Sequence, residues 1–363
     1  MGVNVVNLGD FVKIQTGKLD ANASDENGLY PFFTCAVEPL SINTYAYDCE
    51  CILIAGNGDL NVKYYKGKFN AYQRTYIIEV VDKNLDIRYL YHFLTKYINV
   101  LRQNSIGGVI KYIKLGDLTG IKLPLPPLEE QKKIVDVLDK ADEIRAKKKL
   151  ANDKLDEFLK STFISLFGDP VKNSKNMNIV KVIDVCDCMV PGRDKPKSFS
   201  GDIPWITIDD LKINGITYKS KNNLGLTETE INEVKRKTIP TGSVIMSCVG
   251  NLGLCSIAGQ PMVINQQLHS FQCSEKINNI YLMFILGQMT GYMNKQASST
   301  TVLYMNKTVC NSIPILLPPI EEQNKFAKIV EHVETQKQKN EQVIEQMNNL
   351  FNSLSQRVFK GEL

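Results

Sequence analysis

The sequence has few of the residues and patterns on which enzyme sites and membrane segments usually depend. It contains one tryptophan and three histidines among 363 residues. No apolar run approaches the roughly 20 residues that a transmembrane helix needs. The N-terminus has neither the basic nor the apolar region of a secretory signal. These absences favour a soluble, cytoplasmic protein without membrane contact.

Motifs that hold phosphates or catalytic groups are also missing. The chain has no Gly-x-Gly-x-x-Gly and no Gly-x4-Gly-Lys-Ser/Thr sequence. An adenine methyltransferase needs Asn/Asp-Pro-Pro-aromatic to hold a flipped base, but the Pro-Pro pairs here precede Leu128 and Ile320. We therefore expect no catalytic residue, metal or cofactor. The alternative is a single-chain or fragmentary DNA methyltransferase or endonuclease.

The nine cysteines do not form a recognisable framework. An odd number in a cytosolic chain argues against structural disulfides. Two Cys-x-Cys pairs occur, at 49–51 and 186–188, whereas structural zinc sites favour spacers of two to four residues with a second ligand pair nearby. We expect free thiols, which proteins commonly bury.

The chain does contain an internal repeat. Leu125-Pro-Pro-Leu-Glu-Glu-Gln131 returns 192 positions later as Leu317-Pro-Pro-Ile-Glu-Glu-Gln323. The same offset relates Gly58 to Gly250, and Tyr112 to Tyr304. A repeat of this length indicates a duplicated structural unit.

Weaker matches extend the repeat towards the start of each half. Leu8–Asp10 matches Val182–Asp184, and Tyr30–Phe32 matches Ile203–Trp205. The offset differs from 192 there, as insertions in loops would cause. Because Trp205 corresponds to Phe32, we expect this tryptophan in a core.

Each half begins with short strand-like runs and ends with a long helical pattern. β-Branched and aromatic residues are grouped at 51–55, 75–81 and 243–247, between Gly, Asn and Asp clusters. After each Pro-Pro pair, nothing breaks the helical pattern for about 40 residues, or about 60 Å. We predict an α+β fold with two α/β recognition domains, at 1–125 and 169–317. Long helices would occupy 126–168 and 318–363.

Apolar residues recur along both helices with coiled-coil spacing. The predicted seams are 134, 138, 141, 144, 151, 155, 158 and 162 in the first helix and 326, 330, 333, 343, 347, 350, 354 and 358 in the second. Lys148 and Asn340 interrupt the seams at equivalent positions. We predict an antiparallel pair in which these two residues face each other and set the register, with the domains related by a pseudo-twofold axis.

Such a protein would present two similar reading domains at a fixed spacing. Two domains of this kind suit a split DNA site, with half-site centres separated by about 34 Å, one turn of the duplex. In this architecture the helices determine the spacing between half-sites.

The repeated Leu-Pro-Pro-(Leu/Ile)-Glu-Glu-Gln sequence resembles the helical regions of type I restriction–modification specificity (S) subunits. The closing residues 351–363, their partial echo at 158–168 and the opening residues 8–18 resemble the same family. Asn265-Gln266-Gln267 resembles an Asn-Gln element of its recognition domains, and Tyr72-Gln73-Arg74 is the counterpart in the first half. The resemblance covers essentially the whole chain.

This resemblance implies a non-enzymatic subunit that binds bipartite double-stranded DNA, with one half-site for each recognition domain. It also implies that the long helices dock methyltransferase (modification) subunits, which restriction (motor–nuclease) subunits then join. S-adenosylmethionine would be bound by the methyltransferase and not by this chain.

Polar and basic side chains on loops are the candidates for contact with DNA, because such groups read base edges and bind phosphates. The net charge of +4 permits this without requiring it. In the first half the candidates are Lys63, Lys66, Lys68, Gln73, Arg74 and Lys111. In the second half they are Arg193, Lys195, Lys197, Gln266, Gln267, Ser298, Ser299 and Thr300.

Overall fold

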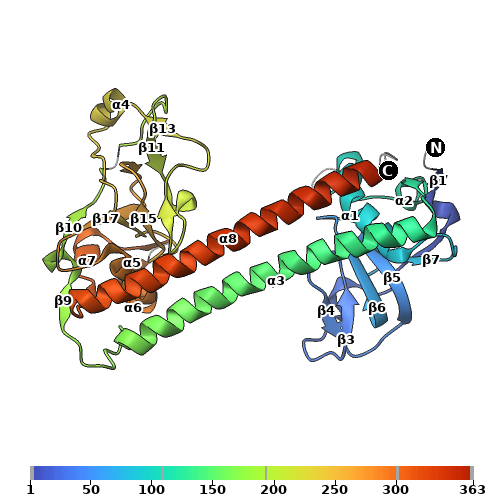
Figure 1. Ribbon diagram of the computed structural model, residues 1–363, viewed down its shortest axis with the longest axis horizontal. Coiled ribbons are helices and arrows are strands. Elements are labelled where there is room, and N and C mark those ends of the chain that lie inside the picture. The colour runs from blue at the N-terminus through green and yellow to red at the C-terminus, as the bar shows by residue number, and fades with distance from the viewer. Residues whose placement is uncertain (1–3, 108–109, 193, 300–301, 360–363) are drawn as a thin grey trace. The chain divides into compact units, whose positions relative to one another are not determined.

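The computed structural model describes residues 4–107, 110–192, 194–299 and 302–359. The chain forms two compact units. Unit 1 contains Met1–Lys149 and Glu341–Leu363, and unit 2 contains Leu150–Asn340. Each unit therefore combines one globular domain with a segment of each of two 40-residue helices, α3 (Leu128–Phe167) and α8 (Ile320–Phe359) (Figure 1).

The globular domain of unit 1 is built on a six-stranded sheet of order β2-β7-β5-β6-β3-β4. The strands are β2 (Val12–Thr16), β3 (Tyr30–Phe33), β4 (Leu40–Ile42), β5 (Tyr47–Ala55), β6 (Val62–Ala71) and β7 (Thr75–Val80). Neighbours are antiparallel except β3 and β6, which run parallel. Strands predicted at 51–55 and 75–81 are confirmed. A further pair, β1 (Val5–Asn7) and β8 (Lys122–Pro124), lies before and after this sheet in the chain.

One face of this sheet is covered by α1 (Ile87–Asn104). Side chains alternate along β5, because successive residues of a strand point to opposite faces. Ile52 and Ile54 belong to the core that contains α1, while Cys51 and Leu53 belong to a second cluster with Phe69. The sheet is thus buried on both faces. The short helix α2 (Leu115–Thr119) completes the domain.

Unit 2 repeats this plan with shorter strands. A five-stranded sheet has the order β10-β17-β14-β15-β12, and a separate three-stranded sheet has the order β13-β11-β16. The strands are β10 (Cys186–Met189), β11 (Ile203–Ile206), β12 (Ile216–Thr217), β13 (Gly225–Leu226), β14 (Val244–Ser247), β15 (Cys255–Ala258), β16 (Val263–Ile264) and β17 (Leu268–Cys273). The other strands are β9 (Ile179–Lys181), β18 (Ser298–Ser299), β19 (Leu303–Tyr304) and β20 (Pro314–Leu316), and the helices are α4 (Glu228–Glu233), α5 (Asn279–Gln288), α6 (Thr290–Gln296) and α7 (Lys307–Asn311). The strand predicted at 243–247 is confirmed.

Backbone hydrogen bonds confirm the weak early matches of the repeat. The Leu8 N–H donates to Ile121 O at 2.9 Å, and the Val182 N–H donates to Ile313 O at 3.1 Å. Trp205 is 3% exposed and lies in β11, which runs parallel to β16. Phe32 is fully buried and lies in β3, which runs parallel to β6. The core position predicted for Trp205 is therefore confirmed.

The repeated Pro-Pro-x-Glu-Glu-Gln sequence joins each helix to its own globular domain. Gln131 is fully buried, and its Nε2 donates to Pro126 O and to Asn84 O, both at 2.8 Å. Its Oε1 accepts from the backbone N–H of Asp86, the N-cap of α1, at 2.8 Å.

Gln323 makes the same contacts at the start of α8. Its Oε1 accepts from the N–H of Asn278, the N-cap of α5, at 2.8 Å, and its Nε2 donates to Pro318 O at 2.8 Å. Both long helices begin directly after the proline pairs, and α3 ends before Gly168, whose φ of +78° suits glycine.

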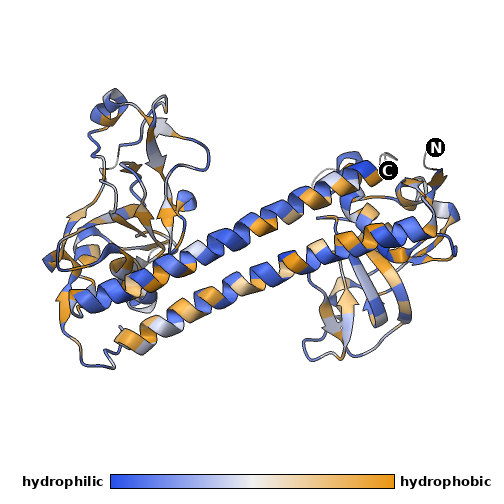
Figure 2. Ribbon diagram, viewed as in Figure 1, coloured by the Kyte–Doolittle hydropathy of each residue, from blue (hydrophilic) through white to orange (hydrophobic). Residues whose placement is uncertain are grey.

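Within each unit the two long-helix segments are antiparallel. The pairing in unit 2 joins Asn340 to Asn152 at 2.7 Å, Lys337 to Asp156 at 2.8 Å, and the Phe326 ring to the Phe163 ring at 5.4 Å between centroids. In unit 1, Arg145 donates to Asn348 at 2.7 Å. The apolar residues that recur along both helices are visible in Figure 2. The predicted fold class, two α/β domains with an antiparallel pair of long helices, is confirmed.

The predicted seams are wrong at one position towards the C-terminal end of each helix, although the seam residue Val358 is 2% exposed. Phe158 and Leu350, assigned to the seams, are 49% and 46% exposed, whereas the adjacent Leu159 and Phe351 are buried. A straight helix drifts by about 20° in each heptad relative to a 3.5-residue repeat. In addition, these helix ends pack on a globular core, so the buried face is set by that core and not by the partner helix.

Candidate nucleic-acid interface

Three backbone segments meet at one end of the unit 1 sheet, and we call this meeting point the unit 1 junction. They are the glycine loop (56–58), the turn between β6 and β7 (72–75) and residues 110–112, where Tyr112 bridges to Ile106. The Gly56 N–H donates to Arg74 O at 2.7 Å, and the Gly58 N–H donates to Lys111 O at 2.9 Å. Because backbone hydrogen bonds join all three segments, the Cα positions of the side chains on them are held in place relative to one another.

Unit 2 has an equivalent junction, formed by residues 248–250 and 265–268 and by the strand pair β18 and β19 (298–299 and 303–304). The Cys248 N–H donates to Gln267 O at 2.9 Å, and the Gly250 N–H donates to Leu303 O at 2.9 Å. Tyr304 bridges to Val249 just as Tyr112 bridges to Asn57. The two junctions therefore share one backbone arrangement.

Glycine is required at one position of both loops and at a second position only in unit 1. Gly58 and Gly250 have φ values of +70° and +72°, which other residues rarely adopt. At Gly56 a Cβ would lie 2.5 Å from Arg74 O, so the turn approaches too closely for a side chain. Unit 2 has Cys248 at this point, with its Sγ 3.3 Å from Gln267 O. The difference between Gly56 and Cys248 thus reflects how closely the neighbouring turn approaches the loop in each unit.

Seven of the predicted DNA-contacting residues lie on the described parts of the junctions. Gln73, Arg74 and Lys111 are exposed residues of the unit 1 junction, and Gln266, Gln267, Ser298 and Ser299 belong to the unit 2 junction. The turns are equivalent, since Thr75 N–H donates to Tyr72 O at 2.8 Å and Leu268 N–H donates to Asn265 O at 3.1 Å. The proposed correspondence between 72–74 and 265–267 is therefore confirmed by geometry.

Lys63 lies beside the unit 1 junction, near the start of β6. Its ammonium group donates to Asn61, whose side chain in turn donates to Cys35 O at 2.9 Å. Cys35 Sγ contacts Asn57 Oδ1 of the glycine loop at 2.8 Å. Burial lowers the pKa of Lys63. This half-buried lysine supports the loop as well as adding positive charge.

Lys66 and Lys68 occupy other surroundings. Lys66 pairs with Glu50 at 3.1 Å, and Lys68 lies 4.5 Å from the centroid of the Tyr45 ring. Neither makes a hydrogen bond to the three junction segments in the part of the chain that the structure describes. The sequence placed them beside Lys63 because they share its strand, but the structure does not bring them into the same contact network.

The two lysines of the second half lie on a loop that is fixed beside α4. Glu230 accepts from Ser198 Oγ at 2.5 Å and from Ser200 Oγ at 3.0 Å. Arg236 donates to Asp194 O at 2.7 Å. Lys195 and Lys197 remain exposed between these anchors. Arg193 and Thr300 lie outside the described residues, and Ser299 lies in β18.

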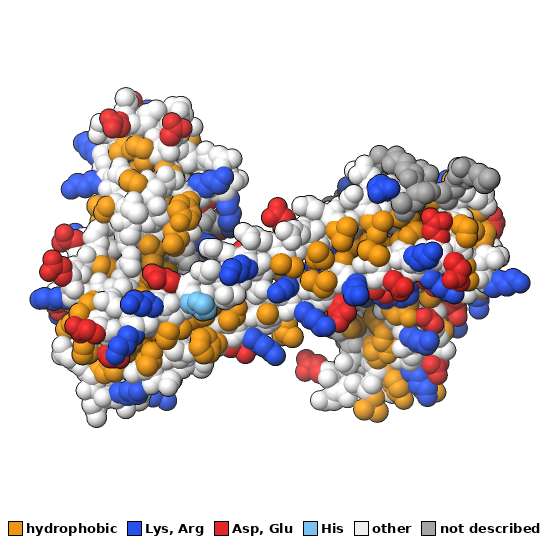
Figure 3. Space-filling model, in the orientation of Figure 1, with side chains coloured by type: hydrophobic (Ala, Val, Ile, Leu, Met, Phe, Trp, Pro, Cys, Tyr) orange, Lys and Arg blue, Asp and Glu red, His pale blue; other side chains and the backbone are white. Residues whose placement is uncertain are grey.

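Sequence reasoning missed exposed tyrosines on the junctions. Tyr112 is 37% exposed and Tyr304 is 44% exposed, and each forms a bridge to its glycine loop. The repeat had related these two residues, but the pattern alone did not separate a core position from a surface one. In the view of Figure 3, basic side chains are interspersed with acidic ones and form no continuous basic patch.

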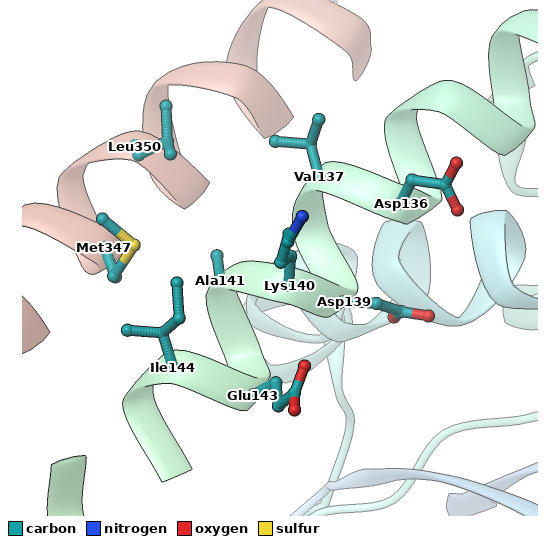
Figure 4. Close-up of a pocket in the computed structure, with 9 residues that line it drawn as sticks. All are labelled: Asp136, Val137, Asp139, Lys140, Ala141, Glu143, Ile144, Met347 and Leu350. Carbon is teal, nitrogen blue, oxygen red and sulfur yellow. The ribbon is translucent and has the colours of Figure 1, made fainter. Parts of the chain in front are cut away.

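The helix segments of unit 1 form a shallow apolar groove with a volume of about 680 Å³. Val137, Ala141 and Ile144 of α3 face Met347 and Leu350 of α8, while Asp136 and Glu143 point away from them (Figure 4). Val137 is 43% exposed. An exposed apolar surface with a charged rim is typical of a contact site for another protein.

The cysteines and histidines of the described residues are mostly buried or half-buried. All nine cysteines are free. Burial raises the pKa of Cys188 to about 11 and lowers the pKa of His269 to about 4. Within the described ranges, no group of three or more His, Cys, Asp or Glu residues is arranged to hold a metal ion, and no helix is long and apolar enough to cross a membrane.

Comparison with known proteins places this architecture in a class. The family model described as the type I restriction modification DNA specificity domain matches residues 1–154 and 174–349. The chain therefore belongs to the family of type I restriction–modification DNA specificity domains.

Individual relatives match more than nine-tenths of the chain. The type I restriction enzyme EcoDI specificity subunit of Escherichia coli is 28% identical over 394 residues, covering 99% of this chain and 88% of that protein. The MjaVIII specificity subunit of Methanocaldococcus jannaschii is 24% identical over 367 residues, covering 91% and 85%.

Solved structures show the same fold at low identity. The S subunit of a type I restriction–modification system from M. genitalium has a TM-score of 0.65 at 15% identity, with coverage of 98% of this chain and 96% of that one. A chain from a structure on complex assembly and conformational transition of the type I system has a TM-score of 0.57 at 17% identity, covering 100% and 98%.

Proposed function

We propose that this chain is a non-catalytic specificity subunit that binds a bipartite double-stranded DNA sequence through one recognition domain for each half-site. The recognition domains are residues 1–125 and 169–317, and the helices are 126–168 and 318–363. The observation that carries the proposal is the repeated junction, which presents polar side chains from loops fixed by backbone bonds in both units. Family membership supports the same function.

The junctions have the chemistry that DNA binding needs. Arg, Lys, Gln and Ser side chains on loops can bind phosphates and base edges, while a rigid scaffold keeps them in register. Lys195 and Lys197 add positive charge on a second loop of unit 2, the one beside α4. The domains share one backbone plan but differ in side chains, so each can bind a different short sequence.

Partner proteins would bind the helices. The relatives are named as specificity subunits of restriction enzymes, and one solved neighbour comes from work on complex assembly of the type I system. We infer that methyltransferase (modification) subunits dock on the helix pair, and that the unit 1 groove with Val137 and Leu350 is one contact. Restriction (motor–nuclease) subunits would join this core, and S-adenosylmethionine would bind the methyltransferase.

Selection from a random library tests the proposal directly. The full-length chain, alone and with its candidate methyltransferase, is incubated with 50-base-pair duplexes that contain a randomised centre, and the retained DNA is sequenced. The expected result is two short fixed sequences separated by a spacer of constant length, with affinity that falls as salt rises. A single uninterrupted motif, or retention without any sequence preference, contradicts bipartite recognition.

A further inference from the structure

The two equivalent turns differ in which side chain is available for an external ligand. In unit 1, Gln73 Nε2 donates to Asp20 Oδ1 at 2.7 Å, so its carboxamide is already engaged. Arg74, the next residue, is exposed, and its guanidinium makes no hydrogen bond or ion pair within the described part of the chain.

In unit 2 the third residue of the turn is engaged and the second is available. Gln267 is the third residue, and its Oε1 accepts a hydrogen bond from Asn265 Nδ2 at 3.0 Å. The second residue, Gln266, is exposed, and its carboxamide has no hydrogen-bond partner among the residues that the structure describes. One turn therefore offers a guanidinium and the other offers a carboxamide.

These groups match different bases. A guanidinium donates two parallel hydrogen bonds to O6 and N7 of guanine, whereas a carboxamide accepts from N6 and donates to N7 of adenine. A carboxamide can also donate to a phosphate, but it adds no charge attraction there, whereas its adjacent donor and acceptor together match the edge of adenine. Exposed Lys111, on the same junction as Arg74, can supply a phosphate contact there.

The backbone of each turn is held in place before any ligand binds. The carbonyl of Arg74 accepts from Gly56 N–H, and the carbonyl of Gln267, next to Gln266, accepts from Cys248 N–H. A fixed backbone reduces the entropy lost when the side chain engages a base and restricts the angles from which it can approach.

We propose that Arg74 reads a guanine in the half-site bound by unit 1, and that Gln266 reads an adenine in the half-site bound by unit 2. This assignment rests on the proposed function and adds the identity of one base in each half-site. It makes these residues specificity-determining positions and does not make them catalytic residues.

Exchange of the two side chains tests the assignment. Wild type, Arg74→Gln and Gln266→Arg, each as the full-length chain, are put through selection on the same random duplex library. We expect Arg74→Gln to replace a guanine preference in one half-site, and Gln266→Arg to replace an adenine preference in the other half-site. Loss of each matched pair should reduce preference for the original base on the order of 5- to 100-fold.

Two control variants separate base reading from general attraction. Arg74→Lys keeps the charge but loses the planar fork, so it should lose most of the guanine preference while keeping affinity for random duplex within about threefold. Lys122→Gln removes an exposed charge on β8 that lies outside the predicted DNA-contacting residues, and it should leave both selected half-sites unchanged.

The outcomes distinguish this inference from the function on which it rests. If the wild type selects no bipartite sequence, the proposed function fails. If it selects one but Arg74→Gln weakens binding equally to all sequences, Arg74 contacts phosphate and the base assignment is overturned. If both exchanges alter the same half-site, the assignment of one base to each unit is overturned.

Discussion

The side chain of Gln131 accepts a hydrogen bond from the backbone N–H of Asp86 at 2.8 Å, at the point where two helices of unit 1 begin. Gln323 and Asn278 repeat this relationship in unit 2. One buried carboxamide thus satisfies groups from the start of a long helix and from the cap of a domain helix. This explains why a glutamine closes the repeated seven-residue motif.

Gln323→Leu should destabilise unit 2 by roughly 2–3 kcal/mol, because Asn278 N–H, Pro318 O and Lys276 O would lose a buried partner. Urea unfolding followed by fluorescence measures this change, since Trp205 is the single tryptophan and lies in unit 2. Glu321→Gln, an exposed change in the same turn, should shift stability by less than about 0.5 kcal/mol. Equal stability of Gln323→Leu and wild type would rule out an anchoring role.

The C-terminal segments of the two long helices differ at one equivalent position. Phe163 is fully buried against Tyr281, Phe167 and Phe326, whereas Ser355 occupies the equivalent position in unit 1. Ser355 Oγ is buried without a hydrogen-bond partner in the described part of the chain.

Phe163→Ala should therefore cost about 3–5 kcal/mol in unit 2, measured from Trp205 fluorescence in urea. Ser355→Ala should leave unit 1 unchanged or stabilise it by about 1 kcal/mol, because it removes an unsatisfied hydroxyl. Amide hydrogen exchange of α8 measures the second effect. Marked destabilisation by Ser355→Ala would show that the hydroxyl makes a contact after all.

His269 makes the stability of unit 2 depend on pH. Burial lowers the pKa of His269 to about 4, while its Nε2 lies 3.0 Å from Asn311 Oδ1. In the unfolded chain the group titrates near 6.5. As pH falls from about 6.5 to about 4, the unfolded state binds a proton that the folded state does not, so stability is lost over this range.

The expected loss is on the order of 3 kcal/mol between pH 7 and pH 4. Unfolding in urea at pH 7.0, 5.5 and 4.5 measures it for wild type and for His269→Gln, which removes the titrating group. The wild type should lose more stability than the variant. Parallel pH profiles would mean that His269 has the same pKa in the folded and unfolded states.

Lys195→Ala should weaken binding to random and selected duplexes to a similar extent, because a lysine on a loop contacts phosphate through charge. The slope of log affinity against log salt should fall by about one. Anisotropy of a labelled duplex in 50–200 mM salt gives both values. Lys181→Ala, at an exposed lysine of β9 that is not among the predicted DNA-contacting residues, is the control. An unchanged slope for Lys195→Ala would remove this loop from the interface.

The predicted register of the long helices places Lys148 opposite Asn340. Asn340 is hydrogen-bonded to Asn152 within unit 2. The predicted facing of Lys148 and Asn340 joins the two units and stays a prediction. An experimental structure of the full-length chain measures the distance between these side chains. A displacement of more than one helical turn along the axis would refute it.

The sequence alone determined the duplication, the two long helices and the strands that precede them. It did so because proline pairs, glycines and apolar spacing act locally, and because the motif ending in Gln131 and Gln323 is repeated at a fixed offset. It also related Tyr72–Arg74 to Asn265–Gln267, which their equivalent hydrogen bonds now support.

Only the tertiary structure decided which face of each helix end is buried and which side chains of the turns are available. Phe158 and Leu350 fit the seam by spacing, yet the globular cores bury their neighbours Leu159 and Phe351. Gln73 is engaged by Asp20, 53 residues away in sequence, while Gln266 has no such partner in the described chain. Contacts between residues distant in sequence depend on the folded packing, so local pattern could not supply them.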